Sequence, residues 1–157
     1  MNTMLNRRDI GYTLISRFEE AFRSFIAAKI VSLFDTYSSG IPAGVIQKAK
    51  ERVGDQTWNE ALDFLDDIDF PDLREIVCFQ KMYESYFPNV PVSQADFERL
   101  MDELYELRCK IAHVKQHFSA FDLDRLLESS TEVARILEDA GMEFLSFSRI
   151  IRHYQGS

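Results

Sequence analysis

The chain has 157 residues, of which 46% are hydrophobic and 28% are charged, values typical of a folded domain and too apolar for a disordered chain. Its 26 acidic and 18 basic side chains give a net charge of −8, which argues against unspecific coating of nucleic acid by Lys and Arg. A small basic cleft within an acidic body remains compatible with this charge.

Apolar residues recur at steps of three and four, the spacing of amphipathic helices, and strand-like alternation never extends over more than a few residues. In chain order, this spacing predicts helices over residues 8–36, 42–53, 58–68, 70–87, 94–113 and 120–140, and a last short helix that contains Phe144 and Tyr154. We therefore predict an all-α fold in a single domain over residues 1–157. The expected architecture is an antiparallel four-helix-type bundle with additional short helices.

Helix-start and helix-stop signals agree with this assignment. A capping residue followed three positions later by an acidic residue occurs at Asn6, Thr57, Ser93 and Ser119. The chain has only 6 glycines and 4 prolines, and they fall near the expected helix ends, for example at Gly54.

No segment is predicted to cross a membrane or to direct secretion. The most apolar stretch, residues 25–34, contains Lys29 and is far shorter than the roughly 20 residues that a membrane-spanning helix needs. Arg7 is not followed by the apolar run of a signal peptide. The two cysteines, Cys78 and Cys109, are too few for a disulfide framework and lack the Cys-x-x-Cys spacing of structural zinc sites. We expect a soluble cytoplasmic domain without a membrane partner.

One stretch of the chain combines a change in charge with two of the three histidines. Residues 96–106 are mainly acidic, whereas residues 107–121 contain no acid. The basic side chains of this second stretch are Arg108, Lys110, His113, Lys115 and His117. They form the densest positive patch in the sequence, and histidine is the side chain whose unperturbed pKa lies nearest neutral pH. The acidic residues between 55 and 75 match no calcium loop, and we interpret them as a solvated face.

Arg108 is the unusual residue of this patch, because it continues the apolar stripe four positions after Leu104. A guanidinium on a buried helix face is costly unless it is paired or faces a cleft or a partner. Two interpretations remain open. Arg108 reaches the rim or pairs with a nearby carboxylate, such as Asp102 or Glu103, from its own or another helix. Alternatively, it faces a cleft that a ligand or second chain fills.

His113 lies five residues after Arg108, which is about 500° on a regular helix and leaves the two side chains roughly 140° apart. They share a face only if the helix ends or distorts near Ala112, or if a second chain completes the site. His113 and His117 also have the i, i+4 spacing of a metal-binding pair. The sequence offers no third ligand, so we predict no metal.

Residues 104–113, which end in Arg108-Cys109-Lys110-Ile111-Ala112-His113, resemble the R-x4-6-H motif of the HEPN superfamily (higher eukaryotes and prokaryotes nucleotide-binding). In that superfamily the motif closes the third long helix of a four-helix bundle. Residues 5–12 and 18–26 are similar to one branch of it. That branch includes the HEPN domain of a PIN-nuclease messenger-RNA surveillance protein and bacterial stand-alone relatives.

The resemblance implies a metal-independent endoribonuclease that acts at a homodimer interface and needs no cofactor. His113 would be the general base on the ribose 2′-hydroxyl, and Arg108 would bind the scissile phosphate, giving a 2′,3′-cyclic phosphate and a 5′-hydroxyl. Lys110, Lys115 and His117 would contact the RNA substrate. The expected class is a toxin, phage-defence or RNA-surveillance nuclease, with an antitoxin or regulatory protein as a further partner.

Cys109 departs from the motif, because active members usually carry Asn, Asp or His after the arginine to help hold the site. We interpret Cys109 as an inert, partly buried thiol beside the site rather than as a nucleophile. Two rival hypotheses stay open. One is a catalytically weak or inactive HEPN module that binds RNA or nucleotide, or mediates dimerisation of a larger assembly. The other is a helical adaptor for another protein, in which Arg108 lies at the rim of a monomer and pairs with an acid.

Overall fold

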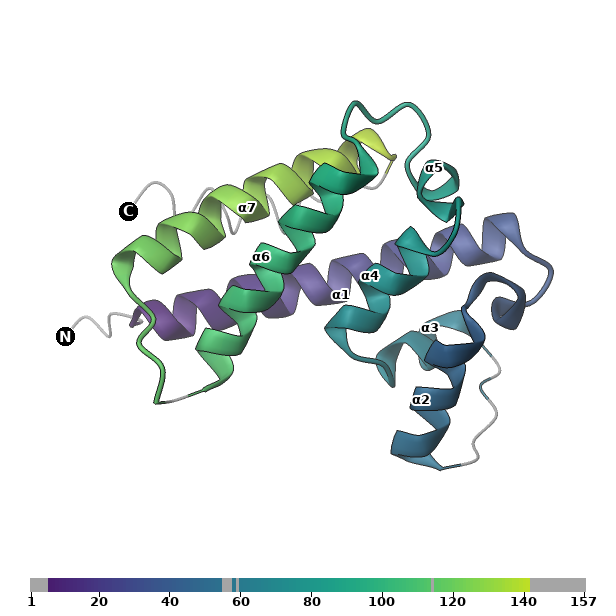
Figure 1. Cartoon of the computed structure of the whole chain (residues 1–157), viewed down its shortest axis with the longest axis horizontal. Coiled ribbons are helices and arrows are strands. Elements are labelled where there is room, and N and C mark those ends of the chain that lie inside the picture. Colours follow the sequence, from purple (N-terminus) through teal and green to yellow (C-terminus); the bar gives the residue numbers. More distant parts are fainter. Residues whose placement is uncertain (1–5, 55–57, 59, 114, 142–157) are drawn as a thin grey trace.

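The computed structural model describes residues 6–54, 58, 60–113 and 115–141, and the regular secondary structure of these residues is entirely helical. The elements in chain order are α1 (Arg7–Leu33), the 3-10 helix η1 (Tyr37–Gly40), α2 (Ala43–Val53), α3 (Ala61–Asp66), α4 (Phe70–Cys78), α5 (Met82–Tyr86), α6 (Gln94–Ala112) and α7 (Ala120–Asp139). The predicted all-α bundle is confirmed (Figure 1).

Helix α1 is the central element and contacts α3, α4, α6 and α7. Its apolar stripe is buried along its length, as its spacing predicts; the buried residues include Leu14, Phe18, Phe22, Ile26 and Ile30. Helix α6 runs back toward the end of the molecule where α1 begins, and α7 then runs in the same general direction as α1 (Figure 1). The C-terminus of α6, which carries the predicted motif, therefore lies beside the N-terminal part of α1.

A glycine makes this close approach possible. A Cβ placed on Gly11 of α1 would lie 2.8 Å from Cδ1 of Ile111 and 3.1 Å from the ring of Phe118. Glycine is the residue that allows a backbone to approach its neighbour so closely. Gly11 therefore brings the end of α6 and the following segment against α1.

The predicted helix over residues 70–87 is wrong, because the chain turns between α4 and α5. Gln80 has φ 52°, a left-handed conformation that interrupts the helical backbone. After the turn, Tyr83 and Phe87 pack against Phe97 of α6, with ring centroids 5.5 and 5.0 Å apart. These aromatic contacts explain why tertiary packing overrides the helical periodicity here.

Three other predicted helices differ in extent or cannot be compared. The first ends at Leu33 rather than at residue 36, and η1 follows it. The helix predicted over residues 58–68 is confined to α3 (Ala61–Asp66). The last predicted helix, around Phe144 to Tyr154, lies outside the described residues.

The start signals at Asn6, Ser93 and Ser119 are confirmed, because each side-chain oxygen accepts a hydrogen bond from the backbone N–H three residues later. Thr57 lies outside the described residues. Gly54 ends α2 with φ 87°, a conformation that glycine adopts without strain. Among the described residues, no helix is both long and apolar enough to span a membrane.

Candidate functional site

Arg108 lies on α6 and pairs with an acidic residue of α1. Its Nε donates a hydrogen bond to Oε1 of Glu19 over 2.5 Å, and 37% of its side chain is exposed. The predicted partners are engaged elsewhere: Asp102 pairs with Arg74 and Glu103 with Arg125. Arg108 is therefore a rim residue whose carboxylate partner comes from another helix, as the first of the two interpretations allows.

The Glu19 carboxylate pairs with two guanidinium groups, those of Arg108 and Arg23. Its second oxygen lies 3.1 Å from Nη1 of Arg23, one turn further along α1, and the Glu19 side chain is only 14% exposed. Arg23 also donates hydrogen bonds to the carbonyls of Leu65 and Ile68. Burial opposes the charge of Arg108, but the hydrogen bond and charge of Glu19 outweigh it and raise the pKa of Arg108 above its usual value.

His113 stands just outside α6, which ends at Ala112. Its backbone is extended, with φ −94° and ψ 102°, and its N–H donates to the carbonyl of Cys109 over 3.0 Å. The His113 side chain is exposed. One of the two conditions under which Arg108 and His113 can share a face, a helix that ends near Ala112, is therefore met.

Arg8 holds the chain in place around His113. Its Nη1 donates to the carbonyls of Lys110 and Ile111 over 2.6 and 2.7 Å, and more weakly to that of His113 over 3.4 Å. Its Nη2 donates to the carbonyl of Gln116. The last carbonyls of a helix have no partner within the helix, so a cation at this point stabilises both the helix end and the turn.

Sequence analysis did not assign a role to Arg8. Its partners are backbone carbonyls more than 100 residues away, and backbone groups leave no signature in the side-chain pattern. The one available signal is its place within residues 5–12, the segment that is similar to a branch of the HEPN superfamily.

The three residues predicted to contact RNA occupy different environments. Lys110 lies 3.2 Å from the buried carboxylate of Asp122, so part of its charge is neutralised. Lys115 and His117 are exposed in the segment between α6 and α7. The hydrogen bond from the backbone of Ser119, together with Lys110, holds the pKa of Asp122 below its usual value.

Cys109 is half-buried and contacts Tyr105, one turn earlier on α6. The hydrogen bond with the Cys109 thiol raises the pKa of Tyr105. The ring of Tyr105 stacks on Phe70 of α4, with centroids 5.7 Å apart. The contact of Cys109 with Tyr105 links it to packing between α6 and α4.

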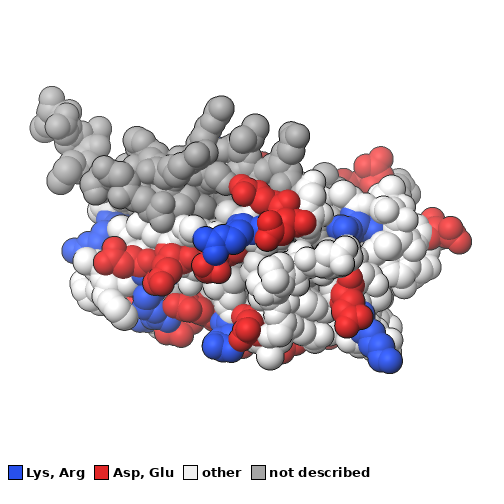
Figure 2. All heavy atoms as spheres, turned by 90° about the horizontal axis from the view of Figure 1, so that it is seen from above, with Lys and Arg blue, Asp and Glu red and all other residues white. Residues whose placement is uncertain are grey.

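The charged surface is mixed. Figure 2 shows one face of the molecule, on which acidic and basic side chains are interspersed and the basic ones do not merge into a continuous patch. Among the described residues, no group of three or more His, Cys, Asp or Glu side chains converges as a metal site would require.

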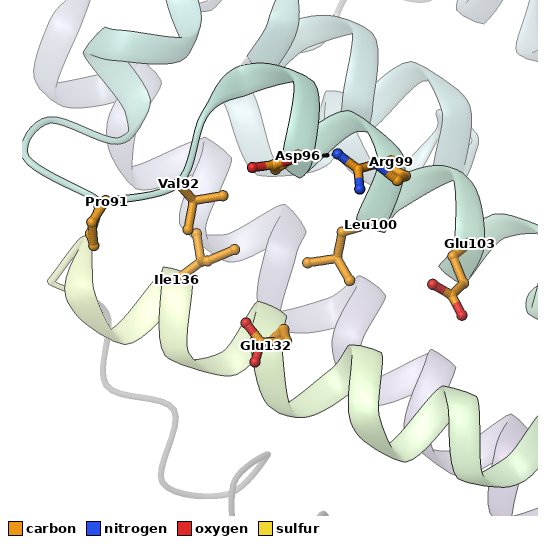
Figure 3. A pocket seen from close by; sticks show the side chains of 8 residues that line it. All are labelled: Pro91, Val92, Asp96, Arg99, Leu100, Glu103, Glu132 and Ile136. Carbon is orange, nitrogen blue, oxygen red and sulfur yellow. Dashed lines mark hydrogen bonds and ion pairs between the residues drawn. The ribbon is translucent and has the colours of Figure 1, made fainter.

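A concavity of about 450 Å³ lies between α6 and α7, away from the motif (Figure 3). Leu100 and Ile136 form its apolar floor, and its charged lining residues are Arg99, Asp96, Glu103 and Glu132. Arg99 is paired with Asp96. The surplus of carboxylates would repel a phosphate backbone, so this concavity is a poor candidate for binding RNA.

Comparison with known proteins gives no assignment: the chain matches no family model, no curated protein and no solved structure. The function must therefore be inferred from the geometry around Arg108 and His113 and from the chemistry of these side chains.

Proposed function

We propose that the protein is a metal-independent endoribonuclease of the HEPN type, which cleaves RNA at the interface of a homodimer. The observation that carries this proposal is the end of α6 at Ala112. This end frees His113 from the helical periodicity and leaves its imidazole exposed, five residues after Arg108.

In the proposed reaction, His113 removes the proton of a ribose 2′-hydroxyl. The 2′-oxygen attacks the adjacent phosphorus, the bond from phosphorus to the 5′-oxygen breaks, and a protonated imidazole returns a proton to that oxygen. The products are a 2′,3′-cyclic phosphate and a 5′-hydroxyl. Such general acid–base catalysis typically accelerates a reaction by about 10²–10⁴.

Arg108 would stabilise the charge that develops on the phosphate. Its exposure of 37% makes its guanidinium accessible to a ligand, although Glu19 occupies one of its donors. A guanidinium has five N–H donors, so phosphate oxygens can bind the donors that Glu19 does not use or replace Glu19. Arg23 would still pair with Glu19 after such an exchange, so the carboxylate would not be left alone.

The proposal of a homodimer follows from the need for both an acid and a base. One copy of the motif supplies a single histidine, whereas a two-fold dimer supplies two histidines and two arginines. A two-fold interface uses the same surface of each subunit. A toxin or defence nuclease of this kind would also require an inhibitory or regulatory partner protein.

A second candidate function is a catalytically weak or inactive module of the same type, which binds RNA or nucleotide or mediates dimerisation. The specific observation in its favour is that Arg108 and Lys110 are already paired with Glu19 and Asp122. A site whose cations are paired in this way would bind phosphate more weakly than the basic sequence pattern suggests.

Cleavage of a fluorescently labelled RNA in the presence of EDTA distinguishes the two functions. The nuclease proposal predicts products with 2′,3′-cyclic phosphate ends, formed by a dimer, and loss of cleavage in Arg108→Ala. Arg135→Ala is the matched control, because Arg135 is an exposed arginine with an ion pair on α7. RNA binding without products supports the second function. A monomer that neither binds nor cleaves RNA contradicts both.

A further inference from the structure

A larger concavity opens at the C-terminal end of α1, next to the segment that leads into α3. Its volume is about 880 Å³, within the range of roughly 300–1,000 Å³ that is usual for pockets that bind small molecules. We call it the α1-end pocket. Its apolar wall contains Ile30, Val31, Phe34 and Trp58, and its other apolar lining residues are alanines.

Trp58 forms a fixed aromatic wall of this pocket. Its Nε1 donates a hydrogen bond to Oδ2 of Asp67 over 2.7 Å, and its ring and that of Phe64 are nearly perpendicular, with centroids 4.9 Å apart. The only polar atom of the indole is therefore already satisfied by the protein. Val31 lies at the exposed side of the pocket, with 75% of its surface accessible, so apolar surface reaches the solvent there.

The charged side chains in the lining of the α1-end pocket are both acidic. The charged residues in its lining are Asp35 and Glu60, and neither forms an ion pair with a described residue. The last turn of α1 also contains no basic side chain, so the negative end of the helix dipole is not compensated from within the helix.

We propose that the α1-end pocket binds an amphiphilic organic cation. The hydrocarbon part of the ligand packs against Ile30, Phe34 and Trp58, and its ammonium group lies near Asp35 and Glu60. An aromatic wall beside carboxylates is a favourable environment for an alkylated ammonium, because the ring face attracts cations as well. This site is separate from the proposed RNA site and does not depend on the nuclease proposal.

The chain provides its own probe for this site, because Trp58 is the only tryptophan of the sequence. The experiment is a titration of Trp58 fluorescence with decyltrimethylammonium below its micelle concentration. Decyl sulfate and decanol, which have the same alkyl chain, are the anionic and neutral comparisons. We expect a saturable change with the cation and at least about tenfold weaker binding of the sulfate, because two carboxylates attract one and repel the other.

Variants locate the cation within the pocket. Asp35→Asn combined with Glu60→Gln should weaken binding of decyltrimethylammonium by about five- to tenfold and leave decanol unaffected, in line with two partly screened charge contacts. Asp63→Asn is the matched control, because Asp63 is an exposed acid of α3 outside the pocket lining. Val31→Arg is a second, independent variant, which places a competing cation at the exposed side.

The proposal is overturned if the cation causes no saturable change, or if decyl sulfate binds as tightly as the cation. It is also overturned if the fluorescence change accompanies loss of the helical circular dichroism signal, since that result indicates denaturation. The proposal is also contradicted if the double variant and Val31→Arg both bind decyltrimethylammonium with the affinity of the wild type.

Discussion

Arg108 of α6 and Glu19 of α1 form an ion pair in which Nε and Oε1 lie 2.5 Å apart. The two residues are 89 positions apart in the chain, so the pair joins two helices that are distant in sequence. Arg23 completes the arrangement from one turn further along α1. A single, mostly buried carboxylate therefore fixes the cation of the proposed site and balances its charge.

Glu19→Gln should destabilise the fold by about 1–3 kcal/mol, because it leaves two partly buried guanidinium groups without their carboxylate. The measurement is urea unfolding followed by circular dichroism. Glu20→Gln is the matched control: Glu20 is exposed and, within the described part of the chain, pairs with Arg17 alone, so its loss should change stability by at most about 1 kcal/mol. Equal effects of the two substitutions would show that the Arg108–Glu19 pair does not stabilise the fold.

Arg8→Ala should destabilise the fold by about 2–3 kcal/mol and increase hydrogen exchange in the segment around His113. The reason is that Arg8 donates to several carbonyls at the end of α6, and a hydrogen bond that involves a charged group contributes about 1.5–3 kcal/mol net. Arg7→Ala is the control, because it removes the same charge from the neighbouring residue but removes a single hydrogen bond of 3.4 Å, to the carbonyl of Phe118. We expect it to cost less than about 1 kcal/mol. Similar exchange rates in both variants would contradict the role of Arg8.

Gly11→Ala and Gly44→Ala should have opposite effects on stability, although both replace a helical glycine. Alanine is favoured over glycine inside a helix by about 1 kcal/mol. A Cβ on Gly44, the second residue of α2, meets nothing within 4 Å, so Gly44→Ala retains part of that gain. A Cβ on Gly11 would meet Ile111 at 2.8 Å, and the resulting overpacking typically costs about 1–3 kcal/mol. Thermal unfolding of both variants measures the difference, and stabilisation by Gly11→Ala would show that α1 and α6 pack less closely.

The Asp122 carboxylate should stabilise the folded state at pH values above its unfolded pKa of about 3.8. This stabilisation should disappear as the pH falls through the lower pKa of Asp122 in the folded state. The direction follows because the unfolded carboxyl binds a proton more readily than the folded one. Urea unfolding of wild type and Asp122→Asn between about pH 2 and pH 6 should give a stability difference that shrinks toward acid. Asp124→Asn, at an exposed position of the same helix, provides the comparison. A difference that stays constant over this range would contradict the assignment.

The sequence predicts helices better than it predicts contacts between them. The caps at Ser93 and Ser119 join a serine side chain to the backbone N–H three residues later, so local spacing is sufficient to locate them. The turn at Gln80 has neither glycine nor proline to mark it and depends on aromatic packing against α6. Such tertiary packing is not visible in a local pattern.

The same limit applies to the candidate site. The position of Arg108 on an apolar stripe indicates that it needs a partner, and the structure supplies one. The identity of that partner, Glu19, depends on how α1 and α6 pack. The positive charge predicted for residues 107–121 is also lower in the structure, because the carboxylate of Asp122, at the start of α7, pairs with Lys110. This pair, too, depends on how the helices pack.

The most direct test of the proposed function compares His113→Ala with His117→Ala in RNA cleavage with EDTA present. Both histidines are exposed and lie close together in the chain, so the two variants lose the same chemical group from the same segment. We predict that His113→Ala lowers kcat by at least about 100-fold, whereas His117→Ala keeps kcat within about threefold and raises KM. Undiminished kcat in His113→Ala would contradict the proposal that this imidazole is the general base.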